Sequence, residues 1–174
     1  MSADIQPVIC TLVFPVRDGQ VLLGLGKKGY NRDLWNGYGG KVDPDDVSVR
    51  HTAVRELQEE AGLGVRETDL RYHGRMTFYW ESVVPGLGVQ TAREVVVHMY
   101  SVSRWSGVPV ESEAMVTPTW FPIAQVPFDR MCPDNPEWLP LVFEGKSFIG
   151  SARYNSSREV VECQVRVMES VVEP

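Results

Sequence analysis

Three glutamates at helical spacing are the residues of this chain whose types and positions best suggest chemistry. Glu56, Glu59 and Glu60 stand at i, i+3 and i+4, so a helix would place all three carboxylates on one stripe of its surface. Like charges at this spacing destabilise an isolated helix by roughly a few tenths of a kcal/mol per pair. Divalent cations between the carboxylates would remove the repulsion, and oxygen ligands favour Mg²⁺ or Mn²⁺. A solvated acidic helix face is the alternative interpretation.

The residues around the glutamates suit the binding of a phosphate. Arg55 precedes the cluster, and its guanidinium can hold one carboxylate in a fixed rotamer through paired hydrogen bonds. Upstream, the run GYGGK at 37–41 lets the backbone approach the helix closely and places one cation beside a bound phosphate.

A helix over residues 47–61 must position these groups. Val54, Leu57 and Ala61 recur at i, i+3 and i+7, which is the spacing of one buried helix face. The candidate caps of this helix are Asp46 or Ser48 at its start and Gly62 at its end.

Strands outnumber helices in the rest of the chain, in mixed order, which predicts an α+β fold. A hairpin is expected where Asp18 and Gly19 separate two apolar β-branched runs, and residues 26–44 are expected to form a functional loop. A second helix is predicted at 136–144, interrupted near Pro140. The predicted strands are 8–16, 20–25, 72–82, 94–103, 118–121 and 159–168.

Length, composition and charge describe one ordinary domain over residues 1–174, with 43% hydrophobic and 23% charged residues. Because 17 basic residues face 23 acidic ones, the net charge of -6 argues against a nucleic-acid polymer as partner. Three cysteines without C-x-x-C spacing predict neither disulfides nor a zinc site. The chain shows neither a signal peptide nor a run of membrane-spanning length, so we expect a cytoplasmic protein without a membrane partner.

The segment 39–63, GGKVDPDDVSVRHTAVRELQEEAGL, resembles the signature of the Nudix hydrolases, Gly-x5-Glu-x7-Arg-Glu-U-x-Glu-Glu-x-Gly-U, where U is a bulky apolar residue. Counted from Gly40, Asp46 takes the place of the first glutamate, and one additional residue separates it from the arginine, which suggests an insertion in the turn at 43–46. The second half matches at every position: Arg55, Glu56, Leu57, Glu59, Glu60, Gly62 and Leu63.

This resemblance implies an α/β/α sandwich around a mixed sheet, and Mg²⁺-dependent hydrolysis, with Mn²⁺ as a possible substitute, of a nucleoside diphosphate linked to another moiety. It implies catalytic roles for Arg55, Glu56, Glu59 and Glu60. The metal ligands that it implies are Gly40, Glu56, Glu59, Glu60 and Glu113. Four carboxylates stay open as the general base: Glu59, Glu60, Glu111 and Glu113.

From about residue 11 to residue 168 the chain is also similar to one branch of the family, the oxidised purine nucleoside triphosphatases. The passages that carry this similarity include LWNGYGGKV, GVPVESEAM and WFPIAQVPFDRMCPDNPEWLP. The branch implies a monomeric enzyme that converts 8-oxo-dGTP and 2-hydroxy-dATP to the monophosphate and pyrophosphate. It implies that Asn36 and Asp134 contact the base edge. The full set of implied substrate-binding residues is Thr11, Tyr30, Trp35, Asn36, Gly39, Gly40, Lys41, Phe78, Trp80, Asp134 and Trp138.

The chain differs from that branch at several positions that bear on base preference. Cys132 replaces an aromatic residue, Asn135 replaces a second aspartate, and Gly26 replaces a basic residue. The stretch 85–93 is longer than the branch requires and has no assigned role. Two alternatives stay open: a Nudix hydrolase of ADP-ribose or capped nucleotides, and a purine nucleotide sensor that has lost turnover.

Overall fold

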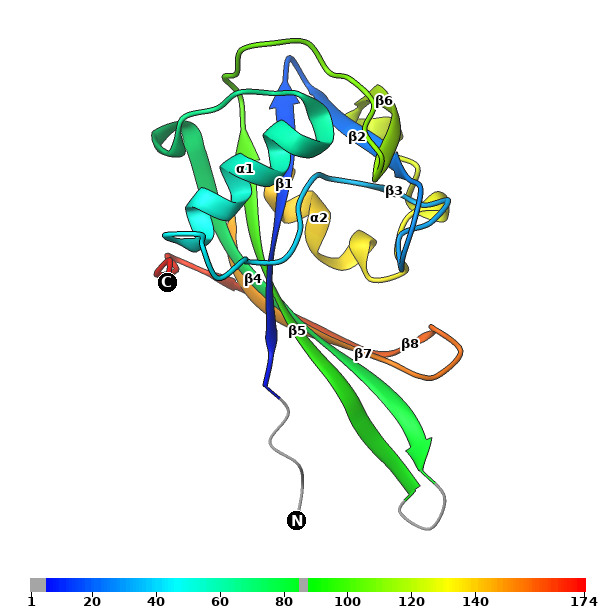
Figure 1. Ribbon diagram of the computed structural model, residues 1–174. Helices are drawn as coiled ribbons and strands as arrows, with labels where there is room; N and C mark the ends of the chain where they lie inside the picture. Colours follow the sequence, from blue (N-terminus) through cyan, green and yellow to red (C-terminus); the bar gives the residue numbers. More distant parts are fainter. Residues whose placement is uncertain (1–5, 85–87) are drawn as a thin grey trace.

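Eight strands and two helices make up the fold in the computed structural model, which describes residues 6–84 and 88–174 (Figure 1). The strands are β1 (Val8–Arg17), β2 (Gln20–Gly26), β3 (Trp35–Asn36), β4 (Leu70–Val84), β5 (Gly88–Val102), β6 (Met115–Pro122), β7 (Ser147–Tyr154) and β8 (Val160–Met168). The helices are α1 (Val49–Ala61) and α2 (Asn135–Phe143), with short 3-10 turns η1 (Glu67–Asp69), η2 (Ile123–Gln125) and η3 (Phe128–Arg130).

The strands form one mixed sheet in the order β3-β2-β1-β5-β4-β7-β8, with β6 paired to β2. The pairs β1–β5 and β4–β7 are parallel, whereas β4–β5 and β7–β8 are antiparallel. The predicted β1–β2 hairpin is confirmed, and its turn residues Asp18 and Gly19 have φ of 53° and 72°. Positive φ at both central residues is the requirement of a type I′ turn, which matches the twist of the strands.

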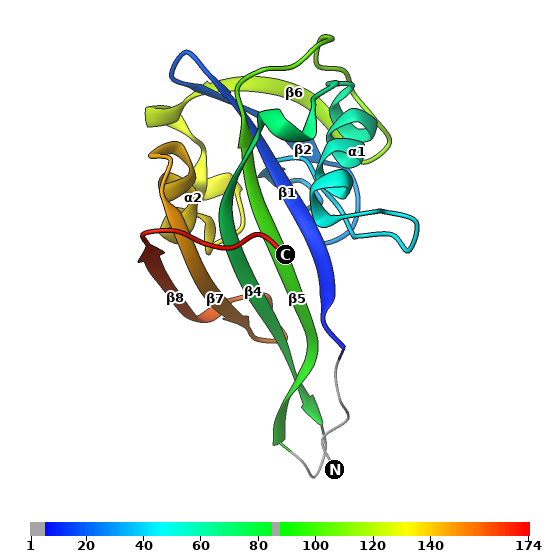
Figure 2. The ribbon, with the colours of Figure 1, turned by 90° about the vertical axis from the view of Figure 1, so that its left-hand side faces the viewer.

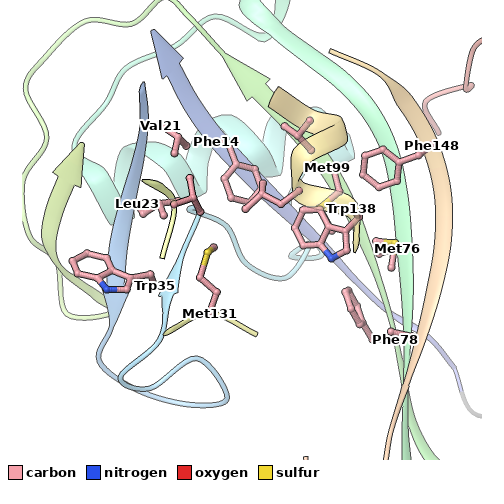
Figure 3. Close-up of a cluster of buried hydrophobic side chains, with 14 of the residues drawn as sticks. Phe14, Val21, Leu23, Trp35, Met76, Phe78, Met99, Met131, Trp138 and Phe148 are labelled. Carbon is pink, nitrogen blue, oxygen red and sulfur yellow. The ribbon is translucent and has the colours of Figure 1, made fainter. Parts of the chain in front are cut away.

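The two helices cover opposite faces of the sheet (Figure 2). The side chains of β1 and β5 alternate between the two core clusters that lie on these faces. Val13 and Tyr100 pack in the cluster beneath α1, while their neighbours Phe14 and Met99 pack in the cluster beneath α2. Figure 3 shows the second cluster, in which Trp138 from α2 lies among side chains from the strands. The expected α/β/α sandwich around a mixed sheet is therefore confirmed.

Helix α1 begins and ends at local signals in the sequence. The Ser48 hydroxyl accepts a hydrogen bond from the His51 N–H at 3.0 Å, so Ser48, and not Asp46, is the N-cap. Gly62 terminates the helix with φ of 71°, and its N–H donates to the Gln58 carbonyl. The buried face of the helix consists of Thr52, Ala53, Leu57 and Ala61.

Two parts of the fold differ from the sequence-based prediction. The expected interruption of α2 is wrong: the helix continues through Pro140, because the buried side chains of Leu139 and Val142 on either side of Pro140 hold it against the sheet. Strands β3 and β7 were not predicted. Of the unassigned stretch 85–93, residues 88–93 extend β5 along β4, and 85–87 lie outside the described residues.

No helix among the described residues is long and apolar enough to cross a membrane.

Candidate active site

A glycine-rich loop brings the carboxylate helix against strand β1. The loop runs beside the strand, since the Val13 N–H donates to the Tyr38 carbonyl at 2.7 Å and the Thr11 N–H to the Gly40 carbonyl at 2.8 Å. A Cβ on Gly39 would lie 2.1 Å from the Thr11 carbonyl oxygen. Only glycine therefore permits this approach, which places the loop between β1 and α1.

Arg55 is held by Asp46 in a two-point ion pair. Its Nε and Nη2 atoms donate to the two Asp46 carboxylate oxygens at 3.0 and 2.8 Å. Asp46 also accepts from the Thr52 hydroxyl at 2.8 Å and the Asp43 N–H at 2.9 Å. These donors, above all Arg55, hold the pKa of the Asp46 carboxyl well below its usual range. Asp46, the last residue of the turn at 43–46, thus reaches Arg55.

Arg55 in turn holds two of the three glutamates. Its Nη1 donates to the Glu56 carboxylate at 2.9 Å and to the Glu59 carboxylate at 3.1 Å. The third carboxylate, Glu60, accepts from the Gly39 N–H at 2.9 Å. Burial raises the pKa of the Glu56 carboxyl, although Arg55 opposes the shift, and raises that of Glu60 to about 7. Two partly buried acids therefore stand beside the glycine loop.

These side chains fit a divalent metal ion. Within residues 6–84 and 88–174, however, there is no group of three or more Asp, Glu, His or Cys side chains placed closely enough to hold an ion in this conformation. Arg55 and the Gly39 N–H hold the carboxylates apart in this conformation. The donors are hard oxygens, which suit Mg²⁺ and Mn²⁺. A Cβ on Gly40 would lie 2.5 Å from the Glu56 carboxylate, so only a glycine lets the loop backbone approach this carboxylate so closely.

The close approach of Gly40 to Glu56 predicts that Gly40→Ala lowers kcat about a hundredfold, because the added methyl would displace a candidate catalytic carboxylate by about an ångström. Steady-state hydrolysis assays measure this effect. Gly64→Ala is the matched control, since its methyl also meets a side-chain oxygen, Ser106 Oγ at 2.7 Å, but away from the site. Equal kcat for the two variants would contradict the prediction.

A cavity of about 800 Å³ adjoins the glycine loop. At one side it is lined by Gly39, Gly40 and Lys41, and elsewhere by aromatic side chains. Trp80 stacks on Tyr154 with ring centroids 5.5 Å apart, and Tyr30 meets Trp80 edge-on at 5.4 Å. Flat aromatic walls of this kind suit a planar heterocycle.

Among the polar side chains that line the cavity, those of Thr11, Asn36, Asp134 and Asn135 are buried. The Asp134 carboxylate accepts from Trp138 Nε1 at 2.6 Å and from the Tyr154 hydroxyl. Burial raises the pKa of Asp134, and these two donors oppose the shift. Asn36 uses its Oδ1 to accept from the Gly37 N–H at 2.9 Å. Among the described residues, Thr11 Oγ1 and Asn135 Nδ2 are buried without a hydrogen-bond partner. Such orphaned groups in a cavity wall suit a polar ligand.

Most of the side chains that the sequence proposed for substrate binding lie together. Trp35 does not line the cavity: it packs edge-on to Phe121 at 4.9 Å, apart from Trp138 in Figure 3. Glu113 is exposed on the segment before β6, and the nearby Glu111 accepts from the Thr117 N–H. The predicted residues that line the cavity are Thr11, Tyr30, Asn36, Gly39, Gly40, Lys41, Phe78, Trp80, Asp134 and Trp138.

Sequence reasoning missed several lining residues on the strands. Arg93, Val95, Val97 and Met99 on β5 all line the cavity, and their period of two was a signal that could have identified them. Tyr154 was missed because strand β7 was not predicted. Its alternation with Phe148 and Ala152, both buried, would have placed it on an inward face.

Three comparisons agree with this arrangement. The profile of the NUDIX domain matches residues 6–142. The chain is 34% identical over 160 residues to the mouse oxidized purine nucleoside triphosphate hydrolase, covering 92% of this chain and 95% of the mouse protein. It is 33% identical over 163 residues to the zebrafish protein of the same description, covering 94% and 97%. The crystal structure of a MutT protein from Bacillus halodurans superposes with a TM-score of 0.73 at 18% identity, covering 91% of this chain and 97% of that one.

The carboxylate helix, the glycine loop and the sandwich that carries them define a hydrolase site, and the chain belongs to the Nudix family. It is a Nudix hydrolase, an enzyme of the pyrophosphohydrolase type, and it is similar over most of its length to the mouse and zebrafish oxidized purine nucleoside triphosphate hydrolases.

Proposed function

We propose that this enzyme hydrolyses oxidised purine nucleoside triphosphates, of the 8-oxo-dGTP and 2-hydroxy-dATP type, to the monophosphate and pyrophosphate in an Mg²⁺-dependent reaction that cleanses the nucleotide pool. One observation carries the proposal: a single cavity is lined both by Asn36 and Asp134 and by the glycine loop that contacts the catalytic helix. A monomeric state, a cytoplasmic location and a single domain over residues 1–174 stay predictions.

The wider part of the cavity suits a purine. Phe78 and Trp80 offer apolar faces, with ring centroids 5.9 Å apart, and Tyr30 closes against Trp80. Asp134 and Asn36 provide polar atoms for the base edge, because a carboxylate accepts hydrogen bonds and an amide both donates and accepts them. Cys132 lines the same cavity where the related branch has an aromatic residue. A purine base bound in the cavity would therefore lie beside a smaller side chain at this position.

The phosphates would lie toward the glycine loop and α1. Lys41 places a cation in the cavity wall, and the Gly40 carbonyl with Glu56, Glu59 and Glu60 would hold Mg²⁺. When bound, the metal neutralises phosphate oxygens and makes the attacking water more acidic. Glu113 is proposed to join these ligands only if its segment moves, because it is exposed before β6.

Glu60 is the carboxylate best suited to accept a proton from the attacking water. Burial raises the pKa of the metal-free Glu60 carboxyl to about 7, near neutral pH, where a general base is most effective, and in this role its carboxylate is not itself bound to Mg²⁺. Arg55, anchored by Asp46, keeps Glu56 and Glu59 in fixed positions beside it. The loop N–H of Gly39 orients the Glu60 carboxylate toward β1.

A substrate panel tests the proposal. We expect pyrophosphate release from 8-oxo-dGTP or 2-hydroxy-dATP with Mg²⁺ at a kcat/KM at least about tenfold above that for dGTP, since a few well-placed polar contacts discriminate by this order. ADP-ribose and a cap analogue in the same panel represent the other Nudix substrates. Faster turnover of ADP-ribose or the cap analogue would overturn the substrate assignment. Tight purine nucleotide binding without product over hours would instead indicate a sensor.

A further inference from the structure

A carboxylate with a donor on each oxygen forms the polar end of the cavity. Asp134 precedes helix α2 and is 2% exposed, and its Oδ2 accepts from Trp138 Nε1 one turn later. Its Oδ1 accepts from the hydroxyl of Tyr154, at the end of β7. Each carboxylate oxygen has two acceptor sites. One site on each oxygen therefore stays available for a ligand.

The ring of Tyr154 is fixed in place by its neighbours. It is 1% exposed, stacks on Trp80 at an interplanar angle of 13°, and meets Tyr30 edge-on at 5.9 Å. Its strand pairs with β4, where Tyr154 stands opposite Trp80. A hydroxyl on a rigid side chain holds its hydrogen-bond partner with little loss of conformational entropy. Tyr154 is thus suited to orient Asp134.

Several groups near Asp134 keep their protons at neutral pH, and the other carboxylates of this region are Glu81, which lines the cavity, and Glu137 on α2. Burial raises the pKa of Tyr30 and of Cys132 to about 12 each, and that of Cys163 on β8 to about 11. Burial raises the pKa of Tyr154 as well. Two guanidinium groups also stand near the cavity: that of Arg158 lies 5.4 Å from the Tyr30 ring centroid, and that of Arg93 lies 5.9 Å from the Trp80 ring centroid.

We propose that Tyr154 is a positioning residue whose hydroxyl, together with Trp138, holds Asp134 as an ionised acceptor for N–H groups on the base edge of the substrate. The inference rests on the proposed function, because it assumes that Asp134 contacts the base. Its physical basis is that a hydroxyl donor on a buried carboxylate stabilises the charged form, which the low-polarity surroundings oppose. Without that donor, Asp134 takes up a proton at higher pH and offers the base a different pattern of donor and acceptor.

The test is Tyr154→Phe, which keeps the ring and removes only the hydroxyl. Carbon-13 NMR of the Asp134 carboxyl in ligand-free protein gives its pKa directly, and we expect this pKa to rise by about one unit in the variant, as for the loss of one charge-assisted hydrogen bond. Calorimetry with the product 8-oxo-dGMP, without metal, gives the binding affinity. We expect the acid-side loss of affinity to begin about one pH unit higher than in wild type, with binding up to about tenfold weaker on the acid side and little changed at higher pH, where Asp134 is ionised in both proteins.

Tyr100→Phe is the matched control. Tyr100 is also fully buried, and its hydroxyl donates to a carboxylate, Glu173, at 2.7 Å, but it lies in the cluster beneath α1 and outside the cavity. This control should change neither the Asp134 pKa nor nucleotide affinity. An unchanged Asp134 pKa in Tyr154→Phe would overturn the inference. A raised pKa with unchanged affinity would show that Asp134 does not contact the base, which contradicts the proposed function instead.

Discussion

Replacing Glu60 by glutamine is expected to lower kcat about a thousandfold, within the range for the loss of a general base. Glutamine has nearly the same shape, and its Oε1 can still accept the Gly39 N–H that Glu60 accepts at 2.9 Å. The variant should therefore bind substrate with a KM close to that of wild type while losing the proton acceptor. Steady-state pyrophosphate release from 8-oxo-dGTP with saturating Mg²⁺ measures both constants.

Glu67→Gln provides the control for this experiment, since it makes the same chemical change on an exposed turn, η1, away from the site. It should leave kcat unchanged, and a Glu60→Gln variant within threefold of wild type would refute the role of Glu60. Stability provides a second readout without metal. Because the folded-state pKa of Glu60 is raised to about 7, wild type loses stability as pH rises from about 4.5 through 7, and the glutamine variant lacks that loss.

Asp46→Asn is expected to lower the free energy of unfolding by about 3 kcal/mol at pH 7, because it removes one partner of a buried ion pair. The Asp46 side chain is only 3% exposed and accepts both hydrogen bonds of the Arg55 fork. Arg55 also orients Glu56 and Glu59, so kcat should fall with stability. Urea denaturation monitored by tryptophan fluorescence measures the first effect, and hydrolysis assays measure the second.

The neighbouring Asp43 supplies the matched control. Its carboxylate lies 3.5 Å from the same guanidinium but is 63% exposed, so Asp43→Asn should cost less than about 1 kcal/mol. The pH dependence distinguishes the two aspartates further. Since the folded-state pKa of Asp46 is depressed, its contribution is present above pH 4 and is lost as pH falls below it. Equal destabilisation by the two variants at pH 7 would argue against the buried pair.

Local signals in the chain were sufficient to predict helix α1, which carries the three glutamates. The Gly62 cap and the apolar spacing of Leu57 and Ala61 are properties of neighbouring residues, so they can be recognised without a tertiary structure, whereas the N-cap stayed open between Asp46 and Ser48 until the structure showed Ser48. The β1–β2 turn followed from Asp18 and Gly19 for the same reason. The family signature extended this prediction to the sandwich fold.

Contacts between distant segments could not be predicted in the same way. Strand β7 and the continuation of α2 through Pro140 both depend on burial against the sheet, which outweighs local propensity. Trp35 and Trp138 are both buried tryptophans, yet only Trp138 lines the cavity, because strand pairing and helix docking set their directions.

The amino-acid sequence by itself determined which groups are proposed for the chemistry: a row of carboxylates on a capped helix, an arginine beside them and a glycine loop before them. The tertiary structure alone decided that Asp46 anchors Arg55, that Glu60 titrates near neutral pH and that Tyr154 donates to Asp134. The physical reason is that helix periodicity depends on covalent neighbours, whereas burial, pKa and hydrogen-bond partners depend on segments that only folding brings together.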